Sequence, residues 1–143
     1  MRLRRAVIDA LVRHARDQAP LECCGLLIGS PGVVEESYPV QNLRNSRVAF
    51  QVDPAGHFTA IRKARDRGLA VVGAYHSHPR SEAVPSETDL REANDPYLLH
   101  VIVSLRGAEP VLRGYRITTE TAVEVELRIA DEASSDSRSA ISD

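Results

Sequence analysis

Cysteine is scarce in this sequence: there are two among 143 residues, and they are adjacent, at positions 23 and 24. Neighbouring cysteines rarely form a disulfide with each other, so a disulfide-stabilised secreted fold is excluded and a reducing, cytoplasmic setting is expected. No apolar run approaches the roughly 18 residues of a membrane span, so no membrane partner is expected. The formal net charge is −2, with 18 basic and 20 acidic side chains, which gives no reason to expect nucleic acid as a partner.

What the sequence does contain is typical of a globular domain. The hydrophobic content is 43% and the charged content is 27%. A chain of this length is expected to form one domain around a single core. Residues 131–143 hold almost nothing that a core could bury, so they are predicted to be a disordered tail. The predicted domain therefore spans residues 1–130.

Periodic patterns predict helices and strands in alternation along this domain. Apolar residues recur at helical spacing over 3–17, and Pro20 follows. The stretch 54–68 has proline at its start and glycine at its end, the usual punctuation of a helix. Strands at 22–30 and 33–42, separated by a glycine- and proline-containing turn, predict a hairpin. Further strands are predicted at 47–53, 69–78, 97–105, 110–118 and 122–130. This order predicts an α/β fold, a single compact domain with a mixed sheet flanked by helices.

Two histidines one residue apart, His76 and His78, end the strand predicted at 69–78, and histidine is otherwise uncommon here, with five in the chain. Side chains at i and i+2 of a strand point to the same face, about 6.6 Å apart along the strand. The two imidazoles can therefore converge on one ion, with nitrogen–metal bonds of about 2.0–2.1 Å. A packing or surface role is the alternative for either histidine alone, but a same-face pair at a strand end favours a metal site.

Asp89 follows eleven residues after His78, and the segment PSETD that ends with it is typical of a helix start. A carboxylate in the first helical turn could reach back over the end of the strand. Two histidines and one carboxylate, with the fourth position left to water, is the arrangement of a catalytic zinc site. A capping box formed by Ser86 and Asp89 explains the same spacing, and the two roles can coexist.

Glu22 leads directly into the apolar run CCGLLIG, where burial of an unpaired carboxylate would be costly. An exposed position at the start of the strand is one interpretation; a general base that takes a proton from metal-bound water is the other. Strand alternation sends Cys23 and Cys24 to opposite faces, so both are predicted to be small buried hydrophobic residues rather than ligands. The remaining histidines have no partner at ligand spacing and are predicted to be structural or on the surface. They are His14, His57 and His100.

Together, the segments LECCGLLIG and HSHPRSEAVPSETD resemble the JAMM metalloprotease domain, also called MPN+ or JAB. The family pattern is an upstream glutamate, then His-x-His-Pro, six residues and Ser-x-x-Asp, and every position is filled here. The resemblance covers residues 1–129 and implies a mixed-sheet architecture related to that of cytidine deaminases.

The resemblance also implies a role for each residue of the pattern. His76, His78 and Asp89 are expected to bind Zn²⁺, and Glu22 to act as general acid and base. Ser86 is expected to polarise the scissile carbonyl or stabilise its oxyanion.

The implied chemistry is hydrolysis of an amide, often an isopeptide, at the carboxyl end of ubiquitin or a ubiquitin-like protein. The short chain and the paired cysteines resemble stand-alone bacterial members that act beside ubiquitin-like sulfur carriers. The expected partner is therefore a sulfur carrier with a Gly-Gly end, and the expected reaction releases cysteine or another adduct from it. The sequence does not indicate an oligomeric state.

Three other classes of protein fit the sequence less well. A non-catalytic MPN scaffold keeps the fold but loses ligands, whereas every ligand and the base are present here. A zinc deaminase needs a Pro-Cys-x-x-Cys segment after its His-x-Glu, and the two cysteines of this chain precede the histidines. A zinc phosphoesterase that starts from His-x-His needs more ligands and a longer chain.

Overall fold

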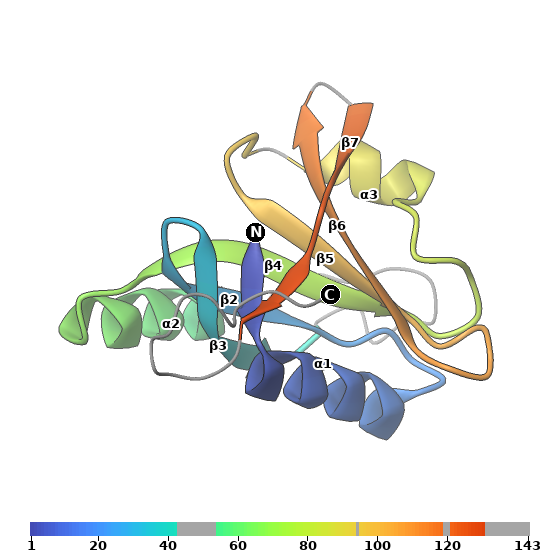
Figure 1. The fold of residues 1–143 in the computed structure, drawn as a ribbon, viewed down its shortest axis with the longest axis horizontal. Coiled ribbons are helices and arrows are strands. Elements are labelled where there is room, and N and C mark those ends of the chain that lie inside the picture. Colours follow the sequence, from blue (N-terminus) through green and yellow to red (C-terminus); the bar gives the residue numbers. More distant parts are fainter. Residues whose placement is uncertain (43–53, 94, 119–120, 131–143) are drawn as a thin grey trace.

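The computed structural model describes residues 1–42, 54–93, 95–118 and 121–130, which form eight strands and three helices (Figure 1). The helices are α1 (Arg5–Gln18), α2 (Pro54–Asp66) and α3 (Glu87–Glu92). The strands are β1 (Arg2–Arg4), β2 (Cys24–Ser30), β3 (Val33–Val40), β4 (Ala70–His78), β5 (Leu99–Ser104), β6 (Val111–Thr118), β7 (Thr121–Val125) and β8 (Arg128–Ala130). The strand predicted at 47–53 and the tail predicted at 131–143 lie outside the described residues.

The strands form one mixed sheet in the order β7-β6-β5-β4-β2-β3-β1-β8. The predicted hairpin is confirmed, since β2 and β3 pair antiparallel, and β4 pairs antiparallel with β2 but parallel with β5. The strand β4, which carries both histidines, therefore lies in the interior of the sheet with a neighbour on each side. An interior strand holds the side chains at its end more firmly than an edge strand would.

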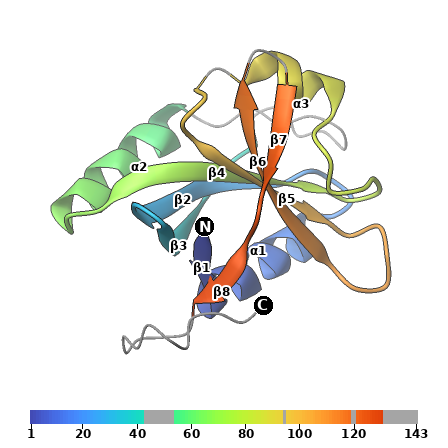
Figure 2. The same ribbon diagram turned by 45° about the horizontal axis from the view of Figure 1, so that its top comes forward.

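One predicted strand, 122–130, is wrong as a single element, because the structure divides it into β7 and β8. The first part pairs with β6, and the second pairs in parallel with β1 at the opposite edge of the sheet. The two strands are separated by residues 126–127 alone, so the sheet must curl until its edges meet, as Figure 2 shows. Alternation predicts an extended chain but does not determine its partner, so it could not reveal this change of partner.

The start of the chain also differs from the prediction. The helix predicted over 3–17 begins at Arg5, because Arg2–Arg4 form the short strand β1 between β3 and β8. Leu3 is fully buried as a strand residue and still contributes to the same core as the helix. The helix predicted at 54–68 is confirmed as α2, which ends two residues earlier at Asp66.

The helices cover opposite faces of the sheet, in agreement with the predicted α/β class. On one face, α1 packs Val7, Leu11 and Ala15 against a cluster that contains Leu27 and Tyr75. On the other face, α2 packs against the even-numbered residues of β2, and α3 packs beside a smaller cluster around Ile102. Within the described ranges, no helix is both long and apolar enough to cross a lipid bilayer.

Candidate metal centre and buried carboxylate

The two histidines at the end of β4 lie on the face of the sheet that α3 covers. His76 and His78 are each 3% exposed, whereas the intervening Ser77 points to the α1 side, as does Tyr75. In the ladder, His76 lies opposite Cys24 of β2 and Ile102 of β5. The predicted same-face pair is therefore present. It follows from the alternation of side chains along β4, which is paired with β2 and β5.

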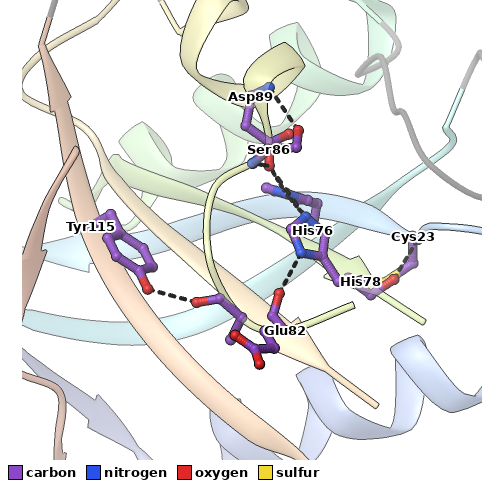
Figure 3. Close-up of polar contacts among 9 residues, drawn as sticks. Cys23, His76, His78, Glu82, Ser86, Asp89 and Tyr115 are labelled. Carbon is purple, nitrogen blue, oxygen red and sulfur yellow. Dashed lines mark hydrogen bonds and ion pairs between the residues drawn. The ribbon is translucent and has the colours of Figure 1, made fainter. Parts of the chain in front are cut away.

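Asp89 reaches the histidines from the first turn of α3 (Figure 3). Ser86 precedes this helix with extended backbone, and its Oγ accepts a hydrogen bond from the Asp89 N–H (3.0 Å). In return, Asp89 Oδ2 accepts a hydrogen bond from the Ser86 N–H (2.8 Å). The predicted capping box is formed, and the same carboxylate oxygen faces both imidazoles. Asp89 is therefore both a member of the capping box and a candidate metal ligand.

Three atoms converge at this point. The Nε2 atoms of His76 and His78 are 3.2 Å apart, and Asp89 Oδ2 lies 3.0 Å from the first and 3.2 Å from the second. Ligand atoms at tetrahedral angles around zinc, with bonds of about 2.0–2.1 Å, are separated by about 3.3–3.4 Å. Within the described parts of the chain, these three residues form the one group of metal-binding side chains at this spacing. The set fits a zinc ion in identity and in separation.

The loop between β4 and α3 fixes the orientation of the cluster. His78 Nδ1 donates to the carbonyl of Glu82 (2.8 Å), so the neutral tautomer directs the Nε2 lone pair at the cluster (Figure 3). The carbonyls on either side of Glu82 are also held: Ser104 Oγ donates to Ser81 (2.6 Å), and the Tyr115 hydroxyl donates to Ala83 (2.6 Å). Three successive carbonyls of this loop are thereby tied to the sheet.

The electrostatics of the cluster favour the cation-binding protonation states of Asp89 and His76, but not of His78. Burial alone would raise the pKa of Asp89, but its hydrogen bonds with His76 and His78 outweigh burial and hold that pKa well below its usual range. Burial also lowers the pKa of His76 and favours its neutral form. The pKa of His78 is raised because Asp89 and the Glu82 carbonyl outweigh burial. A proton and a cation therefore compete for the same lone pairs, and acid should weaken metal binding.

Glu22 is 4% exposed, so the interpretation of it as an exposed strand residue is wrong. It also precedes β2 by two residues instead of starting the strand. Its Oε1 is buried and has no hydrogen-bond partner among the described residues. Burial raises the pKa of Glu22 to about 8, with His78 opposing the rise and Asp89 adding to it. The carboxylate thus lies within electrostatic reach of the cluster.

Two side chains hold the backbone around Glu22, and sequence reasoning missed both. Ser77 Oγ accepts a hydrogen bond from the Cys23 N–H (2.8 Å), while the Ser77 N–H donates to the Cys23 carbonyl (3.1 Å). Asn42 Nδ2 donates to the Glu22 carbonyl (2.9 Å). These bonds fix the segment before β2 against the end of β4. In the sequence, the position of Ser77 between two histidines was the available signal; nothing local marks Asn42.

The two cysteines and the three other histidines lie outside the cluster of His76, His78 and Asp89. Cys23 and Cys24 are buried free thiols on opposite faces, and neither belongs to the cluster. His14 Nδ1 lies 2.7 Å from the Tyr75 hydroxyl on the α1 side of the sheet. His100 lies on β5 with a buried Nε2, near but outside the cluster, and His57 lies on α2.

Comparison with known proteins identifies the class that this fold and site define. Residues 4–118 match the sequence profile of the prokaryotic homologues of the JAB domain, and the chain belongs to this family. The family membership predicted from the motif is therefore confirmed.

Individual relatives are similar over most of their length. The chain is 32% identical over 133 residues to the CysO-cysteine peptidase of Mycobacterium tuberculosis, covering 91% of both chains. It is 37% identical over 106 residues to the desampylase of Haloferax volcanii, covering 69% of this chain and 76% of that protein. The solution structure of a Desulfitobacterium hafniense protein superposes with a TM-score of 0.85 at 36% identity, covering 92% of this chain and 93% of the other.

Proposed function

We propose that this protein is a zinc metallopeptidase that hydrolyses the amide or isopeptide bond at the Gly-Gly end of a ubiquitin-like sulfur-carrier protein. The observation that carries the proposal is the convergence of His76, His78 and Asp89 within 3.2 Å of one another, in a JAB-family chain with a buried carboxylate nearby. Two relatives are a CysO-cysteine peptidase and a desampylase, which supports hydrolysis of protein conjugates. A cytoplasmic location is part of the proposal.

The three converging residues would hold the zinc ion. When bound, zinc supplies an activated water and polarises the carbonyl of the scissile bond. His78 is oriented for this role by its hydrogen bond to Glu82, and Asp89 by the Ser86 N–H. Both are interactions that set the direction of a ligand lone pair.

Glu22 would move the proton. A general base works best when its pKa lies near the operating pH, and burial raises the pKa of Glu22 to about 8. The carboxylate takes a proton as the water oxygen forms the new bond to the carbonyl carbon. It then returns that proton to the leaving nitrogen as the C–N bond breaks. A buried carboxylate held by its backbone is suited to shuttle one proton in this way.

Ser86 would stabilise the oxyanion while it caps α3. The cap uses Oγ as an acceptor, from the Asp89 N–H. A serine hydroxyl also has one hydrogen to donate, and the cap leaves that hydrogen available for the substrate carbonyl. The two roles proposed for Ser86 therefore require different parts of the same hydroxyl.

Glycine in the substrate suits a site this enclosed. Both histidines and Glu22 are at least 96% buried, so a peptide must approach them closely. Glycine permits such an approach because it has no side chain to clash. A folded carrier with a Gly-Gly tail meets that requirement, with the tail at the site and the body outside it.

The test is a hydrolysis panel with zinc-loaded protein. The substrates are a bacterial ubiquitin-like carrier with cysteine amide-linked to its Gly-Gly end, an unstructured peptide with the same end, and lysine-linked ubiquitin dimers. We expect the carrier adduct to be cleaved best, the peptide poorly and the dimers hardly at all. Chelation should abolish cleavage, and zinc should restore it. Glu22→Gln should keep the metal and lose about two or more orders of magnitude in turnover.

The alternative function, a non-catalytic MPN scaffold, makes the opposite prediction for the same panel. Zinc-loaded wild-type protein that bound the carrier but cleaved no substrate would support the scaffold and contradict the peptidase. Equal cleavage of the peptide and the carrier would keep the peptidase but remove the folded sulfur carrier as its substrate.

A further inference from the structure

A cavity of about 540 Å³ adjoins Glu22. Its walls come from the second half of α1, the segment before β2 and the end of β3 with the residues that follow. The lining residues that matter here are His14, Gln18, Glu22, Val40, Gln41 and Asn42. None of the three proposed metal ligands lines it. Glu22 is thus the residue that this cavity shares with the proposed reaction centre.

The proton transfer determines which part of a substrate would lie there. A general acid must come within about 2.6–3.2 Å of the atom that it protonates. The leaving nitrogen must therefore meet the carboxyl group of Glu22, and the rest of the leaving fragment must have space beside it. The carrier's new carboxylate stays on the side of the metal ligands. The cavity provides space of the size that small-molecule sites have, about 300–1,000 Å³.

The lining indicates the chemical class of that fragment. Most of the exposed lining is polar, and three of its residues, Gln18, Gln41 and Asn42, carry carboxamides that can donate and accept hydrogen bonds. No lysine or arginine is among the described residues that line it. The four-carbon stem of a target lysine would need apolar walls to pack against. The N–H groups of these carboxamides can donate hydrogen bonds to the carboxylate and other polar substituents of a small amine, such as an amino acid.

The position of His14 fits the same role. Its imidazole is fixed by the contact of Nδ1 with the Tyr75 hydroxyl (2.7 Å), with the two rings edge to face. Burial lowers the pKa of His14, so a neutral ring faces the cavity at neutral pH. A neutral imidazole contributes a hydrogen bond without adding a charge. The cavity therefore has a fixed wall on α1 and carboxamides around it.

From this arrangement we infer that the cavity beside Glu22 is the subsite for the leaving amine, and that it selects a small polar amino acid through Gln18 and its neighbouring carboxamides. The inference rests on the proposed peptidase function. It adds that the cavity holds the part of the substrate on the nitrogen side of the scissile bond. It places leaving-group specificity on α1, away from the proposed metal ligands.

The experiment uses one carrier with four amines linked to its Gly-Gly end: cysteine, serine, cysteamine and the Nε of lysine. Cysteamine has the size of cysteine without the carboxylate. The values of kcat/KM are compared for zinc-loaded wild type, Gln18→Ala and the control Arg16→Ala. Gln18 is exposed at the end of α1, so its replacement should leave the fold intact. Arg16 is exposed on the same turn but lines a different groove.

We expect wild type to prefer the two amino acids over cysteamine and the lysine linkage. Gln18→Ala should reduce the preference for cysteine over cysteamine by about tenfold, the scale of a hydrogen bond to a charged group. Arg16→Ala should leave the preference unchanged. An equal loss for all four adducts in Gln18→Ala would overturn the inference and assign the cavity to the carrier tail. No change in any adduct would also overturn it. If wild type cleaved none of them, the proposed function itself would fail.

Discussion

The two faces of the sheet use burial for different purposes, and β4 shows the contrast within four residues. Tyr75 and Ser77 point to the α1 side, where the surrounding cluster is apolar and three turns of α1 pack into it. His76 and His78 point to the α3 side, where α3 has no fully buried residue and two imidazoles are buried instead. Apolar burial stabilises the fold, whereas buried polar groups reduce stability unless they are paired. Apolar packing on the α1 face therefore holds β4 in place, and β4 directs its two histidines to the α3 face.

This contrast explains why the segment tolerates no change of register. A one-residue slip of β4 would turn Tyr75 and Ser77 toward α3 and both histidines into the apolar cluster. Pairing with β2 on one side and β5 on the other opposes such a slip. The chemistry of one face therefore depends on the packing of the other.

The largest expected effect is on the α3 face. His76→Ala and His78→Ala should each reduce bound zinc from one per chain to near zero and abolish hydrolysis, because each removes one of three converging ligand atoms. The fold should survive, since the α1 cluster is untouched. Metal analysis after dialysis measures the first effect, and circular dichroism the second. His57→Ala on α2 is the control. Zinc stoichiometry near one in both variants would show that the ion is held elsewhere.

The next effect belongs to the α1 face and should spare the site. Leu27 is fully buried against α1, so Leu27→Ala should lower the free energy of unfolding by about 2–5 kcal/mol. Zinc content and turnover of the folded fraction should stay normal at low temperature. Urea denaturation gives the first quantity, with the exposed Val123→Ala as control. Loss of zinc in well-folded Leu27→Ala would show that metal binding depends directly on packing at the α1 face, contrary to the contrast between the two faces.

Ser86 tests whether a capping residue on the α3 face also acts in the reaction. Ser86→Ala removes a cap, worth about 1 kcal/mol of stability. If the hydroxyl also donates to an oxyanion, the activation barrier should rise by about 2.7–4 kcal/mol, or roughly 100- to 1,000-fold in kcat. Melting and single-turnover kinetics separate the two. A variant that melts earlier but turns over normally would leave Ser86 as a cap alone.

The proposed ligands could be predicted because their spacing is local. His-x-His at a strand end and Ser-x-x-Asp at a helix start are both short patterns, and the structure contains both elements. The burial of Glu22 could not be predicted from local spacing, because distant segments set it. The neighbouring Cys23 N–H, for example, donates a hydrogen bond to Ser77, 54 positions away in sequence.

The fold shows the same division between local and distant information. Apolar, β-forming runs and the turns between them correctly predicted β2–β6, helical spacing predicted α1, and proline and glycine at the two ends of 54–68 predicted α2. Within residues 121–130, β7 pairs with β6 and β8 pairs with β1. These partners are set by the closure of the whole sheet, which a short stretch of sequence does not reveal. The three-residue β1 is too short to have a pattern, and its pairing with β3 and β8 alone makes it a strand.

Ser77 belongs to the α1 face by direction but connects it to the proposed base. Ser77→Ala leaves the Cys23 N–H buried without its acceptor, which should cost about 1–3 kcal/mol of stability. Because that bond also fixes the segment that carries Glu22, kcat of the folded fraction should fall while zinc stays bound. Ser77→Thr keeps the hydroxyl and should recover part of the rate. Leu27→Ala is the comparison, since it destabilises the fold without affecting this segment. Normal kcat in Ser77→Ala would make the bond structural only.

The smallest effect is expected at an exposed ion pair on the α2 side of the sheet, between Glu36 on β3 and Arg67 after α2. Arg67 donates hydrogen bonds to the Glu36 carboxylate, and these bonds lower the pKa of Glu36 below its ordinary value. A carboxyl group with a lowered folded-state pKa stabilises the fold above its unfolded pKa, and this contribution is lost as the pH falls through the lowered value. Both side chains are over 40% exposed, so water and salt screen the pair. Glu36→Gln should therefore shift the urea midpoint of metal-free protein only slightly at pH 7. The shift should be smaller in 0.5 M salt, about three times the physiological ionic strength. It should be smallest at low pH, where wild-type Glu36 is also protonated. A shift as large as that of Leu27→Ala would mean that this exposed ion pair contributes to stability on the scale of the α1 face.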